Sequence, residues 1–390
     1  MDRVLWLGAG ASAASEVSGW PRKPPTINHF FRIGQEIGLH QDEYFRRLFT
    51  FVQNRWGIGA NALVAEEPQI TIETLLSFFD TESQIYPVDE NRLSRDTTYR
   101  DAYFEFQWCH DLLRNYVREV LFRSGAVPDH PRGSCPLHAA IASNLDPSDA
   151  VISFNYDLIM DKALADTGRW NEWAGYAPMI FNKIYDIGHW HTTMPSRHDF
   201  PRSSELVYFK LHGSINWFRS TGIRSAPQSA EIDRIEQDPE HPQQRVISLF
   251  SSQAAGRDLM NAEGLFEGQF CEQLLVPPTM HKNYEAFQPL WVRAEEVLAK
   301  AKELVIVGFS FAPADTQAQW LIHRGLARNP NTVSVILVDS DEVTRERIGN
   351  LILSINSRHQ VAQKYGDFGK YVREQYGSAD AQKEHEPAGV

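Results

Sequence analysis

Three short segments, far apart in the sequence, place small and polar residues directly after an apolar run typical of a strand. They are Gly8-Ala9-Gly10-Ala11-Ser12, Ser153-Phe154-Asn155-Tyr156-Asp157 and Lys210-Leu211-His212-Gly213-Ser214, and Val305 to Phe311 has the same form. The carboxyl ends of parallel strands meet at one edge of a sheet, where open α/β sheets bind ligands. The segments therefore predict one shared pocket that contains a histidine base, an amide, a carboxylate and glycine turns.

Asn155 and Asp157 are two positions apart, so strand alternation turns both side chains toward the same side. Asn155 can donate and accept hydrogen bonds, and so can hold a ribose hydroxyl or orient a water molecule. An ionised Asp157 can accept hydrogen bonds from a carboxamide. Either residue could instead cap a helix that begins near Leu158, and for Asp157 alone this structural role is the better prediction. The two together favour a function.

His212 follows the third predicted strand and precedes Gly213 and Ser214, which leave room beside it. A histidine in this place can act as a base near neutral pH. The alternative is a hydrogen-bonded structural histidine. That alternative fits His191, His281 and His323, which have no comparable setting.

The first glycine turn satisfies the spacing G-x-G-x-x-G/A through Gly8, Gly10 and Ala13. Its backbone N–H groups and the hydroxyl of Ser12 could bind a pyrophosphate at a helix N-terminus. A tight turn without a ligand explains the glycines alone equally well, and the Ser12 hydroxyl on the same turn favours binding. Prolines from Pro21 onward replace the second strand and acidic residue of a dinucleotide fold, so a standard dehydrogenase half is not expected.

Gly308-Phe309-Ser310 has the form of a second phosphate-contacting turn, and Asp339 closes the next predicted strand, where an adenosine ribose would sit. Both could equally be ordinary turn and cap residues. The sequence contains no H-E-x-x-H or C-x-x-C spacing, and no G-x-S-x-G or P-loop motif. We therefore expect no metal, no esterase and no P-loop NTPase.

The composition is that of a folded chain of 390 residues with a net charge of -12, which disfavours general binding to nucleic acid. No run of eighteen apolar residues and no signal-peptide pattern is present, so we expect neither a membrane span nor export. The three cysteines, Cys109, Cys135 and Cys271, are scattered and odd in number. They fit a reducing cytoplasm and exclude a four-cysteine zinc site.

Strands and helices alternate in two parts of the chain, which predicts an α/β fold with a Rossmann-like, doubly wound parallel sheet. Apolar residues between these parts recur at helical spacing, which predicts an inserted all-helical module. The predicted organisation is a sheet domain of residues 1–27 plus 131–370 with irregular insertions at 166–204 and 218–268, a helical insertion at 28–130, and a disordered tail at 377–390.

The motifs Gly-Ala-Gly-Ala-Ser, Ser-Phe-Asn-Tyr-Asp, Leu-His-Gly-Ser and Gly-Phe-Ser-Phe, in this order, resemble the sirtuin-like superfamily. The chain looks most like the bacterial branch that serves as NAD-hydrolysing effectors of anti-phage defence. The resemblance covers the sheet domain only. It implies that Asn155 and His212 are the catalytic pair and that Asp157 holds the nicotinamide carboxamide. It also implies contacts to the rest of NAD from Gly8, Ala9, Gly10, Ser12, Gly308, Ser310 and Asp339.

The sequence departs from the protein deacylases of this superfamily. Their zinc-binding cysteines are absent, and Gly19-Trp20-Pro21 is not followed by the deacylase sequence Asp-Phe-Arg. Both departures favour water as the acceptor, so the resemblance implies an NAD glycohydrolase that releases nicotinamide and ADP-ribose. The alternatives are a protein deacylase or ADP-ribosyltransferase, and a non-catalytic module that senses NAD or ADP-ribose.

An enzyme that consumes NAD must be regulated, and the chain contains no second long module to act as a sensor. We therefore expect a homo-oligomer, a partner protein or both in the cytoplasm. The family's known arrangements suggest a HerA-type ATPase or an Argonaute-type partner. We expect no direct nucleic-acid binding and no contact with a membrane.

Overall fold

The structure is a computed structural model. It describes residues 1–15, 24–68, 70–124, 134–176, 181–186, 189–191, 204–220, 247–250, 271–275, 287–312 and 315–377. The Gly19-Trp20-Pro21 segment, most of the predicted insertion at 218–268 and the predicted tail beyond Gly377 lie outside these residues. No helix in the described ranges is both long enough and apolar enough to span a membrane.

One half of the molecule is built on a six-stranded sheet in which every neighbouring pair of strands is parallel. In order across the sheet, the strands are β11 (Gln360–Tyr365), β10 (Ser334–Val338), β9 (Glu303–Val307), β1 (Arg3–Leu7), β2 (Ala150–Ser153) and β5 (Val207–Lys210).

Numbered along the chain and read from the β5 edge, this order is 3-2-1-4-5-6, the order of dinucleotide-binding α/β sheets. It confirms the predicted Rossmann-like, doubly wound fold. The direction of winding reverses between β1 and β9, which are neighbours in the sheet. Leu7 pairs with both Ser153 and Val307, and Ser153 pairs with Lys210. The four predicted functional turns therefore leave the sheet at one level.

The strands next to the reversal are buried along almost their whole length, as expected for a sheet covered on both faces. Two rows of helices accompany the sheet, and within each row neighbouring helices contact one another. One row contains α9 (Ile159–Asp166), α8 (Pro136–Ser143) and α17 (Phe368–Tyr376), and the other contains α14 (Gln288–Leu298), α15 (Thr316–Ala327) and α16 (Glu342–Ile355).

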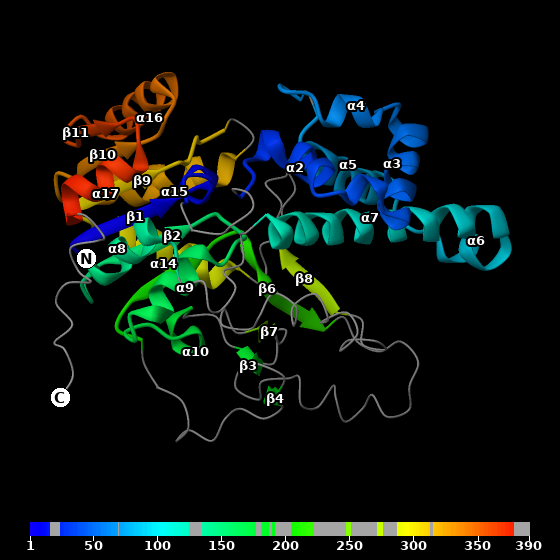
Figure 1. Ribbon diagram of the computed structural model, residues 1–390, viewed down its shortest axis with the longest axis horizontal. Helices are drawn as coiled ribbons and strands as arrows, with labels where there is room; N and C mark the ends of the chain where they lie inside the picture. The colour runs from blue at the N-terminus through cyan, green and yellow to red at the C-terminus, as the bar shows by residue number, and fades with distance from the viewer. Residues whose placement is uncertain are drawn as a thin grey trace.

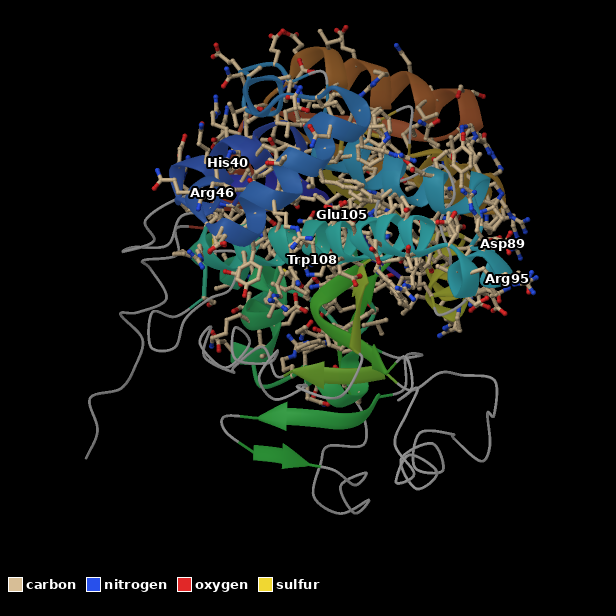
Figure 2. The ribbon with its side chains drawn as sticks, turned by 90° about the vertical axis from the view of Figure 1, so that its right-hand side faces the viewer. His40, Arg46, Asp89, Arg95, Glu105 and Trp108 are labelled. Carbon is tan, nitrogen blue, oxygen red and sulfur yellow. The ribbon has the colours of Figure 1, made fainter. Side chains whose placement is uncertain are left out.

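A helical module occupies the other end of the molecule (Figure 1) and has a hydrophobic core of its own. It consists of η1 (Ile27–His29), α2 (Phe30–Glu36), η2 (Leu39–Gln41), α3 (Glu43–Trp56), α4 (Ala60–Leu63), α5 (Ile72–Ile85), α6 (Glu90–Arg95) and α7 (Thr97–Arg123). Figure 2 faces this module, with Glu105 and Trp108 on α7 and Asp89 beside α6. Leu158 and Ile215, from the sheet half, pack into the module's core and join the two halves.

A second sheet was not expected from the sequence. Its five strands, in order, are β4 (His189–His191), β3 (Phe181–Asp186), β7 (Ile247–Phe250), β6 (Gly213–Ser220) and β8 (Cys271–Leu275). Strands β3, β4 and β7 lie in ranges predicted to be irregular. Strand β8 pairs antiparallel with β6 and does not join the parallel sheet. A short α10 (Glu172–Gly175) precedes β3.

Acid should weaken the sheet half through His138, which is buried on α8 beside Cys135. Burial lowers the pKa of His138 to about 4 from an ordinary value of 6.5. The unfolded chain therefore binds the extra proton between these two values. We expect unfolding free energy to fall by about 1.4 kcal/mol per pH unit from this residue as pH drops from 6.5 toward 4.

Urea unfolding between pH 7 and 4 measures this slope. We expect His138→Gln to make it shallower and His323→Gln, at an exposed position on α15, to leave it as it is. Equal slopes in His138→Gln and the wild type would contradict the assignment.

Candidate active site

Two adjoining cavities open at the carboxyl ends of the central strands, at the point where the winding reverses. The smaller has a volume of about 140 Å³ and contains side chains of Asn155, Asp157 and His212 in its lining. Its remaining wall is largely apolar and comes in part from the helical module, through Phe30, Ile72, Leu76, Val117 and Leu121. The larger cavity is a groove of about 790 Å³ that extends past the ends of β10 and β11.

A chain of hydrogen bonds joins the turn after β1 to the turn after β2. Asn155 Nδ2 donates to the Gly8 carbonyl and to Ser12 Oγ, both at 2.9 Å. The Gly8 carbonyl can only accept, which fixes the orientation of the Asn155 amide. Ser12 Oγ in turn donates to Asp157 Oδ2 at 2.6 Å. The hydroxyl proton of Ser12, expected on a ligand phosphate, is therefore used within the protein.

Asp157 has the structural role that the sequence offered as an alternative. Its Oδ1 accepts from the Ile159 amide at 3.0 Å, at the start of α9. Burial raises the pKa of this carboxyl, while the charge of Lys210 and the hydrogen bond from Ser12 oppose the rise. Asp157 also lines the smaller cavity, so capping the helix does not remove it from the site.

His212 is 4% exposed, lies between aromatic rings and lines the smaller cavity. The ring of Phe154 meets it edge-on, with centroids 4.9 Å apart. Its Nε2 lies 3.8 Å from Oδ1 of the buried Asp315. This distance is too long for a hydrogen bond but within range for stabilising a protonated imidazole. Asp315 could not be predicted from the sequence, because it lies just before α15 and belongs to no motif.

Lys210, on β5, holds the turn after β2 in place. Its ammonium is completely buried and donates to the Asp157 carbonyl at 2.5 Å and to Asp161 Oδ2 at 3.1 Å. Tyr208 donates to the same Asp161 carboxylate at 3.2 Å, and Tyr176 donates to it as well. A buried ion pair needs such additional hydrogen bonds to offset desolvation. The network fixes the backbone between Asn155 and Asp157 relative to β5.

The glycines of the two turns are required by the contact between those turns. A Cβ on Gly8 would lie 2.4 Å from the Gly308 carbonyl oxygen, and one on Gly10 would lie 2.7 Å from Gly308 Cα. Gly308 itself has a φ of +59°, and a Cβ there would lie 2.4 Å from the Ala11 nitrogen. This structural reason accounts for the glycines without a ligand.

Fewer backbone donors face the cavities than the glycine motif suggested. The amides of Gly8, Gly10 and Ala11 donate to the carbonyls of Val307, Gly308 and Gly8 respectively. Helix α1 (Ala9–Ala13) is only five residues long. Among residues 8 to 11, the Ala9 N–H is the one that donates no hydrogen bond within the described part of the chain.

The remaining predicted contacts are distributed along the groove. Gly308 and Ser310 line both cavities, whereas Gly10 and Asp339 line the groove alone. Asp339 Oδ1 accepts from the Asp341 amide at 2.9 Å, and burial raises the pKa of its carboxyl. All of the predicted site residues line one or both cavities except Gly8, which takes part through its carbonyl.

The chemistry of the site is that of protein side chains. Within the described ranges, no group of three or more His, Cys, Asp or Glu side chains is arranged to hold a metal ion. The titratable groups around the smaller cavity are Tyr156, His212, Glu73, Asp157 and Asp315. The arrangement can orient a polar ligand and move a proton near His212.

No protein-family model matches the sequence, and no curated protein matches it. Among solved structures, the chain is similar to Sir2 in complex with the inhibitor EX-527, 2'-O-acetyl-ADP-ribose and a deacetylated p53 peptide. The two chains share 12% identity at a TM-score of 0.36, over 96% of this chain and 91% of the other. Likeness at this level carries no argument about function, and the fold class rests on the strand order of the sheet itself.

We expect Lys210→Met to destabilise the protein by about 3–5 kcal/mol, because it leaves the Asp161 carboxylate buried without its cation. Arg92→Met, which removes an exposed ion pair with Asp96, is the control and should leave the unfolding midpoint unchanged. Urea unfolding measures both variants. A loss for Lys210→Met no larger than that of the control would show that the buried pair does not hold the turn.

Proposed function

We propose that the protein hydrolyses NAD at the bond between nicotinamide and ribose. The observation that carries this proposal is that two cavities meet at the switch point of the sheet, the place between β1 and β9 where the direction of winding reverses. The smaller contains Asn155 and His212, and the larger continues along the strand ends. Sheets with this strand order bind dinucleotides at that point. The groove volume of about 790 Å³ also lies within the usual range of ligand sites, roughly 300–1,000 Å³.

The shapes of the two cavities suggest how NAD would lie. An apolar protein cavity of about 150 Å³ is known to hold one benzene ring. The smaller cavity, at about 140 Å³ and with an apolar wall, therefore suits the nicotinamide ring. The rest of the dinucleotide would follow the groove past Gly308 and Ser310 toward Asp339.

The proposed reaction breaks the bond between C1′ of the ribose and N1 of the nicotinamide. Both bonding electrons go to the ring nitrogen, and the ring leaves as neutral nicotinamide. Its positive charge passes to the ribose, and the oxygen of a water molecule then bonds to C1′ and loses one proton. Holding the ring and the diphosphate in place favours this separation of charge.

His212 is the group placed to accept the proton of the water, and Asp315, 3.8 Å away, would stabilise the imidazolium that results. Asn155 directs both Nδ2 protons to the protein. Its Oδ1 is then the atom that would accept a hydrogen bond from the water or from a ribose hydroxyl.

Two alternatives use the same pocket. Protein deacylation or ADP-ribosyl transfer would begin with the same bond cleavage and use another acceptor. A sensor of NAD or ADP-ribose would bind without cleavage. The apolar enclosure of His212 by Phe154 and the helical module favours a small acceptor such as water.

The biological setting is a further part of the proposal and rests on the motif resemblance alone. The enzyme would deplete NAD in the cytoplasm of a bacterium under phage attack. It would be controlled by homo-oligomerisation or by a partner protein such as a HerA-type ATPase or an Argonaute-type protein.

We expect His212→Ala to lower the rate of nicotinamide release from NAD by at least ~10²-fold, the usual contribution of a general base. Asn155→Ala should cause a loss of similar size. The measurement is nicotinamide release by the purified protein over a range of protein concentrations. His323→Ala, at an exposed position on α15, is the matched control and should retain the wild-type rate.

A His212→Ala variant that turns over like the wild type would overturn the assignment of the base. If the wild type releases no nicotinamide at any concentration, a binding titration decides what remains. Tight NAD binding would point to the sensor, and no binding would refute the dinucleotide site.

A further inference from the structure

The two cavities meet at a small set of residues that line both of them. These are Ala9, Ile27, Glu73, Gly308, Ser310 and Ala312. Of these six, Glu73 is the one with an ionisable side chain. It comes from the helical module, whereas Asn155, His212 and Asp315 come from the sheet half.

This junction corresponds to a definite part of the proposed substrate. With the nicotinamide ring in the smaller cavity and the diphosphate in the groove, the ribose attached to the ring lies where the cavities join. Its C1′ is the atom that gains positive charge as the bond to nicotinamide breaks. The junction is therefore the place where a negative charge has the largest effect on the rate.

We infer that Glu73 is a catalytic residue of this site, with its carboxylate facing the nicotinamide ribose and stabilising the positive charge that develops there. The inference rests on the proposed function and adds a catalytic group from the helical module. No bond to Glu73 forms or breaks. Its effect is electrostatic, and it acts on the pyridinium of bound NAD as well as on the charged ribose.

The other carboxylates of the smaller cavity, Asp157 and Asp315, lie away from the groove. Asp157 accepts hydrogen bonds on both oxygens, from Ser12 and from the Ile159 amide. Asp315 lies beside His212. Neither lines the groove, so neither is placed at the junction as Glu73 is.

The local structure holds Glu73 in position. It lies in the first turn of α5, which begins at the cap residue Thr71, whose hydroxyl accepts from the Thr74 amide. On either side of Glu73, Ile72 and Leu75 are 5% and 0% exposed and belong to the core of the module. The backbone of Glu73 is thus tied to a packed helix at a position that lines both cavities.

The test compares NAD⁺ with NADH, whose nicotinamide ring carries no charge. Both are titrated into full-length protein that also carries His212→Ala, so that NAD⁺ is not consumed. We expect this protein to bind NAD⁺ more tightly than NADH by about 5- to 10-fold, and Glu73→Gln to bring the ratio close to one. Glu43→Gln is the matched control, because Glu43 occupies the first turn of another helix of 14 residues, α3, and lines neither cavity.

Turnover gives a second measure in the protein with intact His212. We expect Glu73→Gln to lower kcat by at least ~10²-fold, because the carboxylate acts most strongly in the charged transition state, and to raise KM by about the same 5- to 10-fold by which it weakens NAD⁺ binding. Glu43→Gln should keep the wild-type kcat. If Glu73 had only a structural role, Glu73→Gln would weaken the binding of both nucleotides. It would not lower the ratio of NAD⁺ affinity to NADH affinity with NADH affinity unchanged.

The outcomes separate the two proposals. An NAD⁺ to NADH ratio that Glu73→Gln does not alter overturns the role of Glu73, whether or not the protein hydrolyses NAD. A ratio that depends on Glu73 in a protein without turnover supports the place of Glu73 at the ribose and refutes the hydrolase. Failure of both nucleotides to bind refutes both.

Discussion

The site depends on the burial of one positive charge. The Lys210 ammonium has no access to water, so its desolvation must be offset by Asp161, by the two tyrosines around that carboxylate and by the Asp157 carbonyl. These hydrogen bonds form only in one geometry, so they hold the turn after β2 in place against β5. The chain from Asn155 through Ser12 then ties the same turn to β1. Three strands are thereby held in one arrangement at their carboxyl ends.

The second constraint is that the site is shared between two cores. The sheet half supplies Asn155, Asp157, His212 and Asp315, while η1, α2, α5 and α7 supply Glu73 and much of the apolar wall. Leu158 and Ile215 pack across the junction, so the two cores are in contact close to the cavity. A movement of the helical module would alter the shape of the smaller cavity. The proposed regulation by assembly or by a partner protein would then have a direct route to the reaction.

The sequence predicted the central sheet because strands such as Val4 to Leu7 are continuous apolar runs, which buried parallel strands require. It also brought Asn155, His212 and the two glycine turns together, since every turn follows a strand of one sheet. Strand β11 was missed because it is an edge strand with largely exposed residues. Glu73 could not be predicted, because the spacing of apolar residues in α5 identifies only the face that packs in the core. Which polar position of α5 lines a cavity depends on tertiary packing. The commitment of Ser12 to Asp157 likewise depends on a contact between residues 145 positions apart.

The central claim is that a dinucleotide binds across both cavities at the switch point. The most direct measurement is an experimental structure of the Asn155→Ala protein with NAD bound. We expect the nicotinamide ring in the smaller cavity next to His212, its ribose at the junction, and the diphosphate beside the turns that follow β1 and β9. Density for NAD at another surface, or with its adenine in the smaller cavity and its nicotinamide in solvent, would contradict the account.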